Sequence, residues 1–223
     1  NVGMKMVMLL IVSMGIKFKK TILVLLIIIP TIGFGQIDTT RLYWDNGNLA
    51  SEGVIKDGKL EGLWRNYDEK GNLESEENHI HSMQNGLSKY YHKNGQIHYT
   101  GNFKDNEKEG QWKWYTKSGQ LIEEGNFDED KSEGLWKIYF NNNQLKLEVN
   151  FKNGIRNGLW KEYHENGQLY GKGRFFNGEM IIQECFNKDG EKKYIRLFYE
   201  TGETLSEINY ENGEGISRKC WNG

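Results

Sequence analysis

The sequence predicts an all-β fold, an elongated antiparallel meander or solenoid of tandem 24-residue β-hairpins. Three observations predict it. A turn glycine returns every 24 residues, a turn rich in Gly or Asn comes roughly every twelve residues, and aromatics form 13% of a chain that has one Pro and a mean hydropathy of −0.75. Because so polar a chain lacks material for a large aliphatic core, its Tyr, Trp and Phe side chains must supply the packing.

The repeat places the same residue types in the same columns of six successive units. The columns are a turn Gly (Gly47, Gly71, Gly95, Gly119 and Gly167, with Asn143 in the gap), a Tyr (Tyr43, Tyr67, Tyr91, Tyr115, Tyr139 and Tyr163), a Leu or Ile (Leu49, Leu73, Ile97, Leu121, Leu145 and Leu169), a mostly Phe column (Ile55, His79, Phe103, Phe127, Phe151 and Phe175), a second Gly (Gly62, Gly86, Gly110, Gly134 and Gly158) and a Trp (Trp64, Trp112, Trp136 and Trp160, with Ser88 as the exception).

Each unit has room for two strands of about seven residues between two turns. Asn-Gly occurs nine times, for example at Asn94–Gly95 and Asn166–Gly167. Both residues tolerate the positive φ that tight hairpin turns require. No helix fits between turns so closely spaced. Six hairpin units are therefore predicted over residues 36–178, with every strand paired to its sequence neighbour.

The period slips after Gly167, because Gly190 follows 23 residues later and Gly202 only 12 after that. Residues 179–223 are predicted to hold degenerate repeats, truncated at their C-terminal end, since terminal units of arrays often differ from the rest. Their strands are expected near 179–186, 191–199, 204–210 and 214–221.

The two cysteines, Cys185 and Cys220, would then lie three strands apart, about 14 Å at ordinary strand spacing. A disulfide needs Cα atoms within about 7 Å. Two unpaired thiols, or a bridge between two chains, are expected.

Residues 1–35 differ from the rest of the chain. A lysine-rich start precedes the apolar run 21–29, and the small residue Gly35 precedes Gln36. This is the order of a secretory signal peptide, with Met14 as the expected start after upstream residues. The run is about half of the roughly 20 residues that a membrane span needs. The sequence predicts export to the periplasm, the outer-membrane surface or the medium, with cleavage between Gly35 and Gln36.

Charge excludes two classes of partner. Four of the 29 basic residues and none of the 31 acidic residues lie in the first 35 positions, so the mature chain carries 25 basic and 31 acidic residues, a net charge of −6. Nucleic acids and anionic membrane surfaces attract basic proteins. No nucleic-acid partner and no anionic membrane binding are expected.

The two faces of the sheet are expected to differ. Because 24 is even, each column keeps its face from unit to unit. Even positions of the second strand are mostly polar, which would place the Trp column on a polar face unless a bulge at the preceding glycine resets the alternation. The odd-numbered positions form the expected apolar face, with Leu121, Gly125, Phe127, Leu135 and Tyr139 as examples.

An aromatic row rimmed by polar groups is typical of a binding face. The alternative is that the same rings pack on the strand glycines at 53, 101, 125 and 173 as the core of the array. The predicted partner-binding residues are Trp64, Trp112, Trp136 and Trp160.

No catalytic, cofactor-binding or metal-binding set emerges. His79 and His81 alternate on one strand, but a metal site needs a third and usually a fourth ligand. The acidic turn 128–130 lacks the spacing of a calcium loop. Gly-x-Ser-x-Gly, a phosphate-binding loop and a Ser, His and Asp set outside the repeat are all missing. The sequence predicts a non-enzymatic protein without a cofactor.

The pattern Gly-x-Trp-Lys-x-Tyr-x-x-x-Gly-Gln-Leu resembles the MORN repeat, in its bacterial variant the YwqK-type family of toxin–antitoxin antitoxins. Residues 134–139 and 158–169 carry the resemblance best. It implies an elongated sheet of hairpins that serves as an interaction module, and the antitoxin label implies neutralisation of a partner toxin. A classical antitoxin acts in the cytoplasm, whereas residues 14–35 predict export.

Three functions therefore stand as hypotheses. The first is a secreted or periplasmic scaffold that binds a protein or an envelope polymer, with self-association into a homo-oligomer as one form. The second is an antitoxin or immunity-type protein that neutralises a toxin. The third is a glycan or cell-wall binding module, since repeated Trp and Tyr also build such modules.

Overall fold

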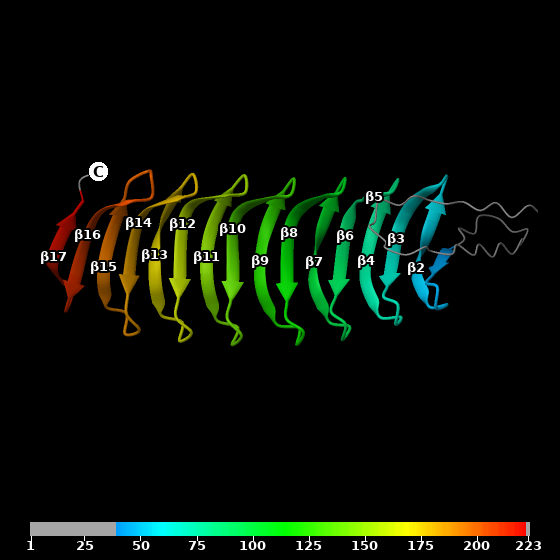
Figure 1. The fold of residues 1–223 in the computed structure, drawn as a ribbon, viewed down its shortest axis with the longest axis horizontal. Coiled ribbons are helices and arrows are strands. Elements are labelled where there is room, and N and C mark those ends of the chain that lie inside the picture. The colour runs from blue at the N-terminus through cyan, green and yellow to red at the C-terminus, as the bar shows by residue number, and fades with distance from the viewer. Residues whose placement is uncertain (1–38, 222–223) are drawn as a thin grey trace, which may run out of the picture.

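The computed structural model describes residues 39–221, so the predicted signal peptide and its cleavage site lie outside the described residues. Over residues 39–221, seventeen strands form one antiparallel sheet in which strands adjacent in sequence pair, except that the short strand at 83–84 and the strand after it both pair with the strand before them (Figure 1). The predicted meander is confirmed. The strands are β1 (Thr39–Tyr43), β2 (Leu49–Lys56), β3 (Lys59–Tyr67), β4 (Leu73–Ile80), β5 (Met83–Gln84), β6 (Gly86–Tyr91), β7 (Ile97–Lys104), β8 (Glu107–Tyr115), β9 (Leu121–Asp128), β10 (Lys131–Tyr139), β11 (Leu145–Lys152), β12 (Ile155–Tyr163), β13 (Leu169–Phe176), β14 (Glu179–Phe186), β15 (Lys192–Phe198), β16 (Thr204–Glu211) and β17 (Glu214–Cys220).

Two kinds of turn alternate along the chain. A short turn joins β9 to β10 through Glu129 and Asp130, whose φ values of 48° and 62° are those of a type I′ hairpin turn. A longer turn joins β8 to β9, where Thr116 N donates to Gln120 O and Gly119, at φ 84°, donates to Thr116 O. Each repeat contributes one turn of each kind, so the short turns line one edge of the sheet and the longer turns the other.

Hydrogen bonds also join successive turns along both edges. At the short-turn edge, Asp130 N donates to Lys108 O at 3.1 Å. At the long-turn edge, the Asn94 side-chain amide donates to Lys117 O at 2.7 Å. Neighbouring hairpins are therefore held together at their ends as well as through the strand ladders.

The predicted assignment of all odd-numbered positions to one face is wrong. In a two-residue hairpin turn the flanking residues pair, so an odd position pairs with an even one, as Lys131 does with Asp128. Directly paired residues point to the same face. The irregularity near Gly134 shifts the register by two residues, from Glu133–Asn126 to Lys137–Glu124, and leaves this relation intact. Face parity thus inverts from each strand to the next as far as β13, whereas Lys172 in β13 pairs with Glu184 in β14 and keeps its parity.

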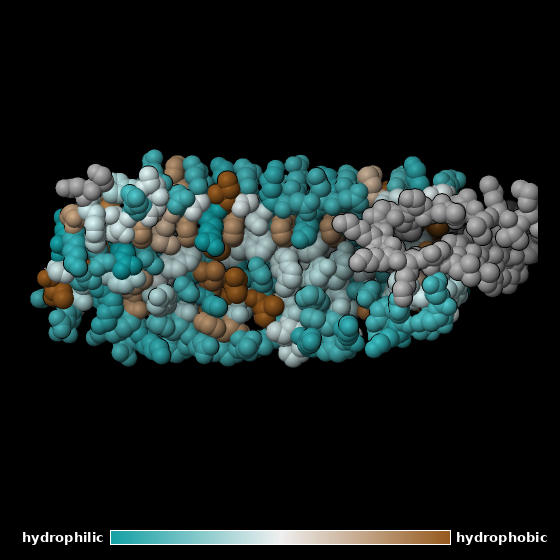
Figure 2. All heavy atoms as spheres, in the orientation of Figure 1, coloured by the Kyte–Doolittle hydropathy of each residue, from teal (hydrophilic) through white to brown (hydrophobic). Residues whose placement is uncertain are grey.

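The consequence is that the even-numbered Trp column shares a face with the odd-numbered Gly and Phe columns, as the pair Trp112–Gly125 shows. We call this the aromatic face. Leu135 and Tyr139, which were expected beside Phe127, lie on the opposite face, here called the charged face. Figure 2 shows white and brown atoms along the middle of the viewed face and teal atoms along both long edges.

The Trp rings lie flat on strand glycines of the preceding strand. A Cβ added to Gly53, Gly101 or Gly125 would overlap the indole of the Trp eleven residues later. The expected packing is thus confirmed at these three glycines, whereas Gly173 instead adjoins the carbonyl oxygen of Ile182. In the fifth unit Val149 takes the place of the glycine, and the Trp160 ring reaches Gly171.

A single row of side chains, twelve charged and one uncharged, crosses the charged face with one residue from each of thirteen strands, and we call it the ionic row. Cross-strand neighbours alternate in sign over most of its length, and opposite charges in such positions stabilise a sheet. The row is Arg41, Glu52, Arg65, Glu76, Lys89, Thr100, Lys113, Glu124, Lys137, Glu148, Lys161, Lys172 and Glu184, with Thr100 as its uncharged member.

Strands β14 to β17 continue the sheet in the places where the slipped period predicts strands. Cys185 in β14 is buried and Cys220 in β17 is exposed, and both are free cysteines. The strand order separates them by β15 and β16, as expected.

Candidate functional site

The Trp ladder that was predicted to bind a partner is buried. Trp64, Trp112, Trp136 and Trp160 are only 1%, 0%, 6% and 8% exposed. The indole nitrogens of the first three donate to backbone carbonyl oxygens at 3.1 to 3.2 Å. The prediction of an exposed ladder is wrong because of the parity inversion described above, and these rings form the core of the array.

A regular set of exposed apolar side chains lies on the charged face. Leu63, Leu87, Leu135 and Leu159, the leucine row, are between 39% and 58% exposed and recur at the 24-residue period, with Gln111 in the gap. Cross-strand neighbours of the row are mostly Asn, such as Asn150 opposite Leu135. Each leucine stands two residues before a base of the ionic row, so the leucine row and the ionic row run side by side.

Tyrosine hydroxyls reinforce the ionic row. Tyr91 donates to Glu76 at 2.8 Å, and Tyr139 donates to Glu124 at 2.7 Å. Tyr67 and Tyr163 make the same bond fifteen residues back, to Glu52 and Glu148. The bond from Tyr91, with the ion pairs to bases, lowers the pKa of Glu76. Burial and the adjacent carboxylate raise the pKa of Tyr139 to about 12.

One repeat replaces the aromatic core by polar groups. Glu77, His79 and Ser88 occupy the Gly, Phe and Trp columns of the same unit, and Glu77 pairs with Trp64 while Ser88 pairs with Gly101. Gln84 donates to Glu77 at 2.8 Å, and His79 Nε2 lies 3.4 Å from the same carboxylate. Burial alone would raise the pKa of Glu77, but hydrogen bonds from His79, Gln84 and Ser75 lower it.

These three residue types are those of a hydrolase triad, yet the geometry does not fit nucleophilic catalysis. Ser88 is 0% exposed, and its hydroxyl and the Nδ1 of His79 are both buried without a hydrogen-bond partner. A nucleophile must contact its base and be reached by substrate. Within residues 39–221 no group of three or more His, Cys, Asp or Glu side chains is placed to hold a metal ion. The acidic turn 128–130 has a structural use, since Asp130 accepts a bond from Lys108 N.

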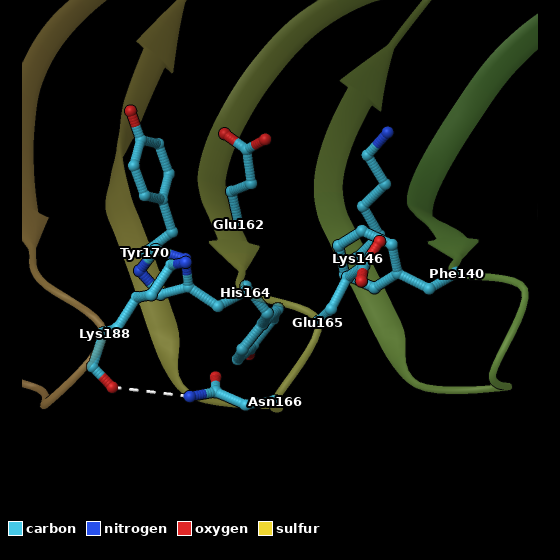
Figure 3. Close-up of a pocket in the computed structure, with 9 residues that line it drawn as sticks. Phe140, Lys146, Glu162, His164, Glu165, Asn166, Tyr170 and Lys188 are labelled. Atoms are coloured by element: carbon cyan, nitrogen blue, oxygen red, sulfur yellow. Dashed lines mark hydrogen bonds between the residues drawn. The ribbon is translucent and has the colours of Figure 1, made fainter.

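A shallow pocket opens at the long-turn edge between the turns that follow β10, β12 and β14 (Figure 3). Tyr170 is 40% exposed there, and its ring meets that of His164 edge-on at 5.2 Å. The ring nitrogen Nε2 of His164 is buried without a partner. In contrast, the equivalent His92 Nε2 bonds Tyr115 O at 2.9 Å. The other lining residues are Phe140, Lys146, Glu162, Tyr163, Glu165, Asn166 and Lys188.

The sequence contains signals for these features. They could not be interpreted as long as the odd-numbered positions were all assigned to one face. The exposed leucines were expected in the apolar layer, and the Thr100 gap in the Glu column is visible as a departure from period. Likewise, Glu77, His79 and Ser88 depart from their columns within one unit, which is the signal of a locally rebuilt core.

The fold and these surfaces define a class: an open-sheet protein of tandem β-hairpins with a packed aromatic face and a polar, accessible one. A family model described as the MORN repeat variant matches five consecutive segments, residues 60–81, 84–105, 108–129, 132–153 and 156–177. The chain therefore carries five tandem MORN repeats of the variant type. Strands β1 and β2, and those from β14 on, lie outside the matched segments.

Comparison with solved structures finds only partial likenesses. A crystal structure of TarM from S. aureus, in complex with Fondaparinux, alpha-GlcNAc-glycerol and UDP, is 13% identical, with a TM-score of 0.31 over 39% of this chain and 18% of that one. The GtfA/B complex is 14% identical, with a TM-score of 0.29 over 40% of this chain and 18% of that one. The TcdB2-TccC3-TEV structure is 12% identical, with a TM-score of 0.23 over 77% of this chain and 12% of that one.

This chain thus spans less than a fifth of the length of each of these proteins, and such likenesses carry no argument about function. The comparison with curated proteins found no match. In the part of the chain that the structure describes, no helix has the length and hydropathy to cross a membrane.

Proposed function

We propose that this protein is an exported, non-enzymatic scaffold that binds another protein through its charged face. The observation that supports the proposal most directly is the leucine row, whose four side chains are exposed at every repeat but one. Apolar side chains set among charges of both signs are typical of protein-binding surfaces. Rows of successive hairpins are about 10 Å apart, so a partner could contact several leucines at once.

Photo-crosslinking tests this surface. The full-length chain, which keeps the predicted signal peptide, carries a photoreactive residue at Leu135 or Leu159, is expressed in its own cell and is irradiated. We expect a covalent adduct with a discrete protein at these positions and none from the exposed turn residue Ser118, the matched control. Adducts of equal yield at all three positions would contradict the proposal. An adduct with a second copy of the chain would identify the partner as a homo-oligomer.

Export is tested separately by N-terminal sequencing of the native protein. We expect it to begin at Gln36. The small residue before the cleavage point and the short apolar run support this expectation. A full-length cytoplasmic product would contradict export and would favour the toxin-neutralising role that the YwqK-type resemblance implies.

Glycan binding is a second candidate because of the pocket at the long-turn edge. Tyr170 presents an exposed ring beside Asn166 and Glu162, and the lining lysines and glutamates balance in charge. An aromatic platform with interspersed donors and acceptors suits a neutral sugar. Saturation-transfer NMR with cellotriose and chitotriose tests this. We expect transfer that Tyr170→Ala abolishes and that His98→Ala, its counterpart three repeats earlier, leaves intact. No transfer from either sugar would exclude this function.

A further inference from the structure

We propose that Thr100 marks an acid-binding slot, in which the charged face receives the carboxylate of an Asp or Glu side chain from a protein partner. The slot is the one place in the first five repeats where the ionic row lacks its acid. The inference rests on the proposed protein-binding function and names the chemistry that the partner brings to that face.

The other repeats show what surrounds an acid in this column. Glu76 accepts from Tyr91 at 2.8 Å and from Arg65 at 3.0 Å, with Lys89 at 3.9 Å. Glu124 is similarly placed, with Tyr139 at 2.7 Å and Lys113 at 3.4 Å. Each acid is therefore flanked by a basic residue on each neighbouring strand, and it accepts a hydrogen bond from the tyrosine fifteen residues further along the chain.

The same donors are present around Thr100. Lys89 and Lys113 are its two cross-strand partners on the same face. Tyr115 follows fifteen residues later, in the column whose members Tyr67, Tyr91, Tyr139 and Tyr163 donate to an acid. Thr100 does not replace the carboxylate, because its hydroxyl is uncharged, sits on a short side chain and is held close to the backbone by its bond to Ser88 O at 2.8 Å. The donors of a carboxylate site remain while the carboxylate is missing.

The electrostatics of the slot are locally positive in a chain that is acidic as a whole. Lys89 and Lys113 each have an acid on one side only, whereas Arg65 has Glu52 and Glu76 on its two sides. The two lysine side chains are 38% and 36% exposed, so an incoming group can reach them. A carboxylate placed between them gains two attractive neighbours, and such complementarity favours one register of docking.

The apolar surroundings favour a protein side chain over a free anion. Leu87, two residues before Lys89, is 46% exposed on the same face. A partner segment can therefore place an aliphatic side chain on Leu87 and an acid in the slot. A free anion gains only the exposed charges, which are worth little in water. The expected partner is a segment with Asp or Glu next to a large aliphatic residue.

The test uses two peptides as probes, Leu-Thr-Glu-Thr-Leu and its Gln counterpart, titrated into the ¹⁵N-labelled mature chain. We expect shifts at the amides of Thr100, Lys89 and Lys113, with binding about fivefold weaker for the Gln peptide. Thr100→Glu fills the slot from within and should remove the shifts. Thr100→Val, which keeps the size and the charges, should retain them.

A gain-of-site variant completes the design. Glu124→Thr recreates the slot one repeat later, between Lys113 and Lys137, and should produce a second set of shifts. Equal binding of the two peptides, or unchanged binding to Thr100→Glu, would overturn the slot. If crosslinking from Leu135 still succeeds in that case, the proposed protein-binding function stands without it. Acetate that reproduces the shifts at the peptide's affinity would also overturn the proposal, since it would show a free-anion site.

Discussion

At the scale of single residues, the fold depends on an indole ring placed on a glycine. Gly125 has no side chain, so the Trp136 ring lies directly against its backbone, and Phe127 meets that ring at 5.1 Å in a T-shaped contact. Edge-to-face contacts of this kind add stability beyond the area buried. Because a single-layer sheet has no second layer to cover its rings, Trp112 and Trp136 are buried by aromatic side chains of neighbouring strands.

Replacement of a buried ring therefore should destabilise the whole array. We expect Trp136→Ala to lower the free energy of unfolding by about 3–5 kcal/mol, the usual cost of removing a buried aromatic side chain. Denaturant unfolding followed by circular dichroism measures it. Trp221→Ala, which removes a ring that is 43% exposed, is the control and should change little. An unchanged midpoint for Trp136→Ala would contradict the core assignment.

Glu123 provides a pH-dependent test of the aromatic face. It lies opposite Trp114 and Ile138, and burial there raises the pKa of its carboxyl above the ordinary value. A raised folded-state pKa means that the protonated form stabilises the fold at low pH and that this contribution is lost as pH rises through the folded pKa. Glu123→Gln should therefore raise the midpoint of unfolding at pH 7. Below pH ~4 the gain should vanish. An equal gain at both pH values would refute the role of ionisation.

At the scale of strands, the ionic row aligns each strand with its neighbours. A slip by one residue would move every charge to the aromatic face, which strongly disfavours the wrong register. The row also makes a prediction at its one uncharged member within the first five repeats.

We expect Thr100→Glu to complete the row between Lys89 and Lys113 and to stabilise the sheet by about 0.2–1 kcal/mol relative to Thr100→Gln, the uncharged control. Screening should remove the difference at about 1 M salt, where the Debye length is roughly 3 Å. Thermal unfolding at low and high salt measures both variants. A difference between them that does not change with salt would show that charge is not its cause.

The strands were predictable from sequence and the faces were not, for one physical reason. Turn glycines such as Gly119 recur independently of how strands pair, so the period alone places the turns and strands of the six regular units. The face of Trp136 depends on which residues pair across the neighbouring turns, and this register changes with the number of residues in each turn. The Thr100 gap is equally visible in the sequence, but Lys89, Lys113 and Tyr115 join it only once the register is known.

At the scale of the whole molecule, the sheet is long and one layer thick (Figure 1). Strands about 4.8 Å apart give a particle roughly 80 Å long. Small-angle scattering of the mature chain should show a rod-like distance distribution with that maximum, and circular dichroism should show a β spectrum without a helical minimum. A compact, near-spherical distribution would contradict the open sheet.

The polar core of one repeat also affects how the molecule withstands force. Trp64 belongs to a small cluster with Leu42 and Leu60, whereas Trp136 and Trp160 belong to a separate, larger one. Between them stand Glu77, His79 and Ser88, with two buried polar atoms unsatisfied. In an array stabilised by contacts between nearest neighbours, the weakest junction separates cooperative blocks. A pull from the N-terminal end of the described strands should therefore unfold the first hairpins as one block and stop at that junction. The strands beyond the junction, including those of the Thr100 slot, would remain folded while the first hairpins unfold under the force.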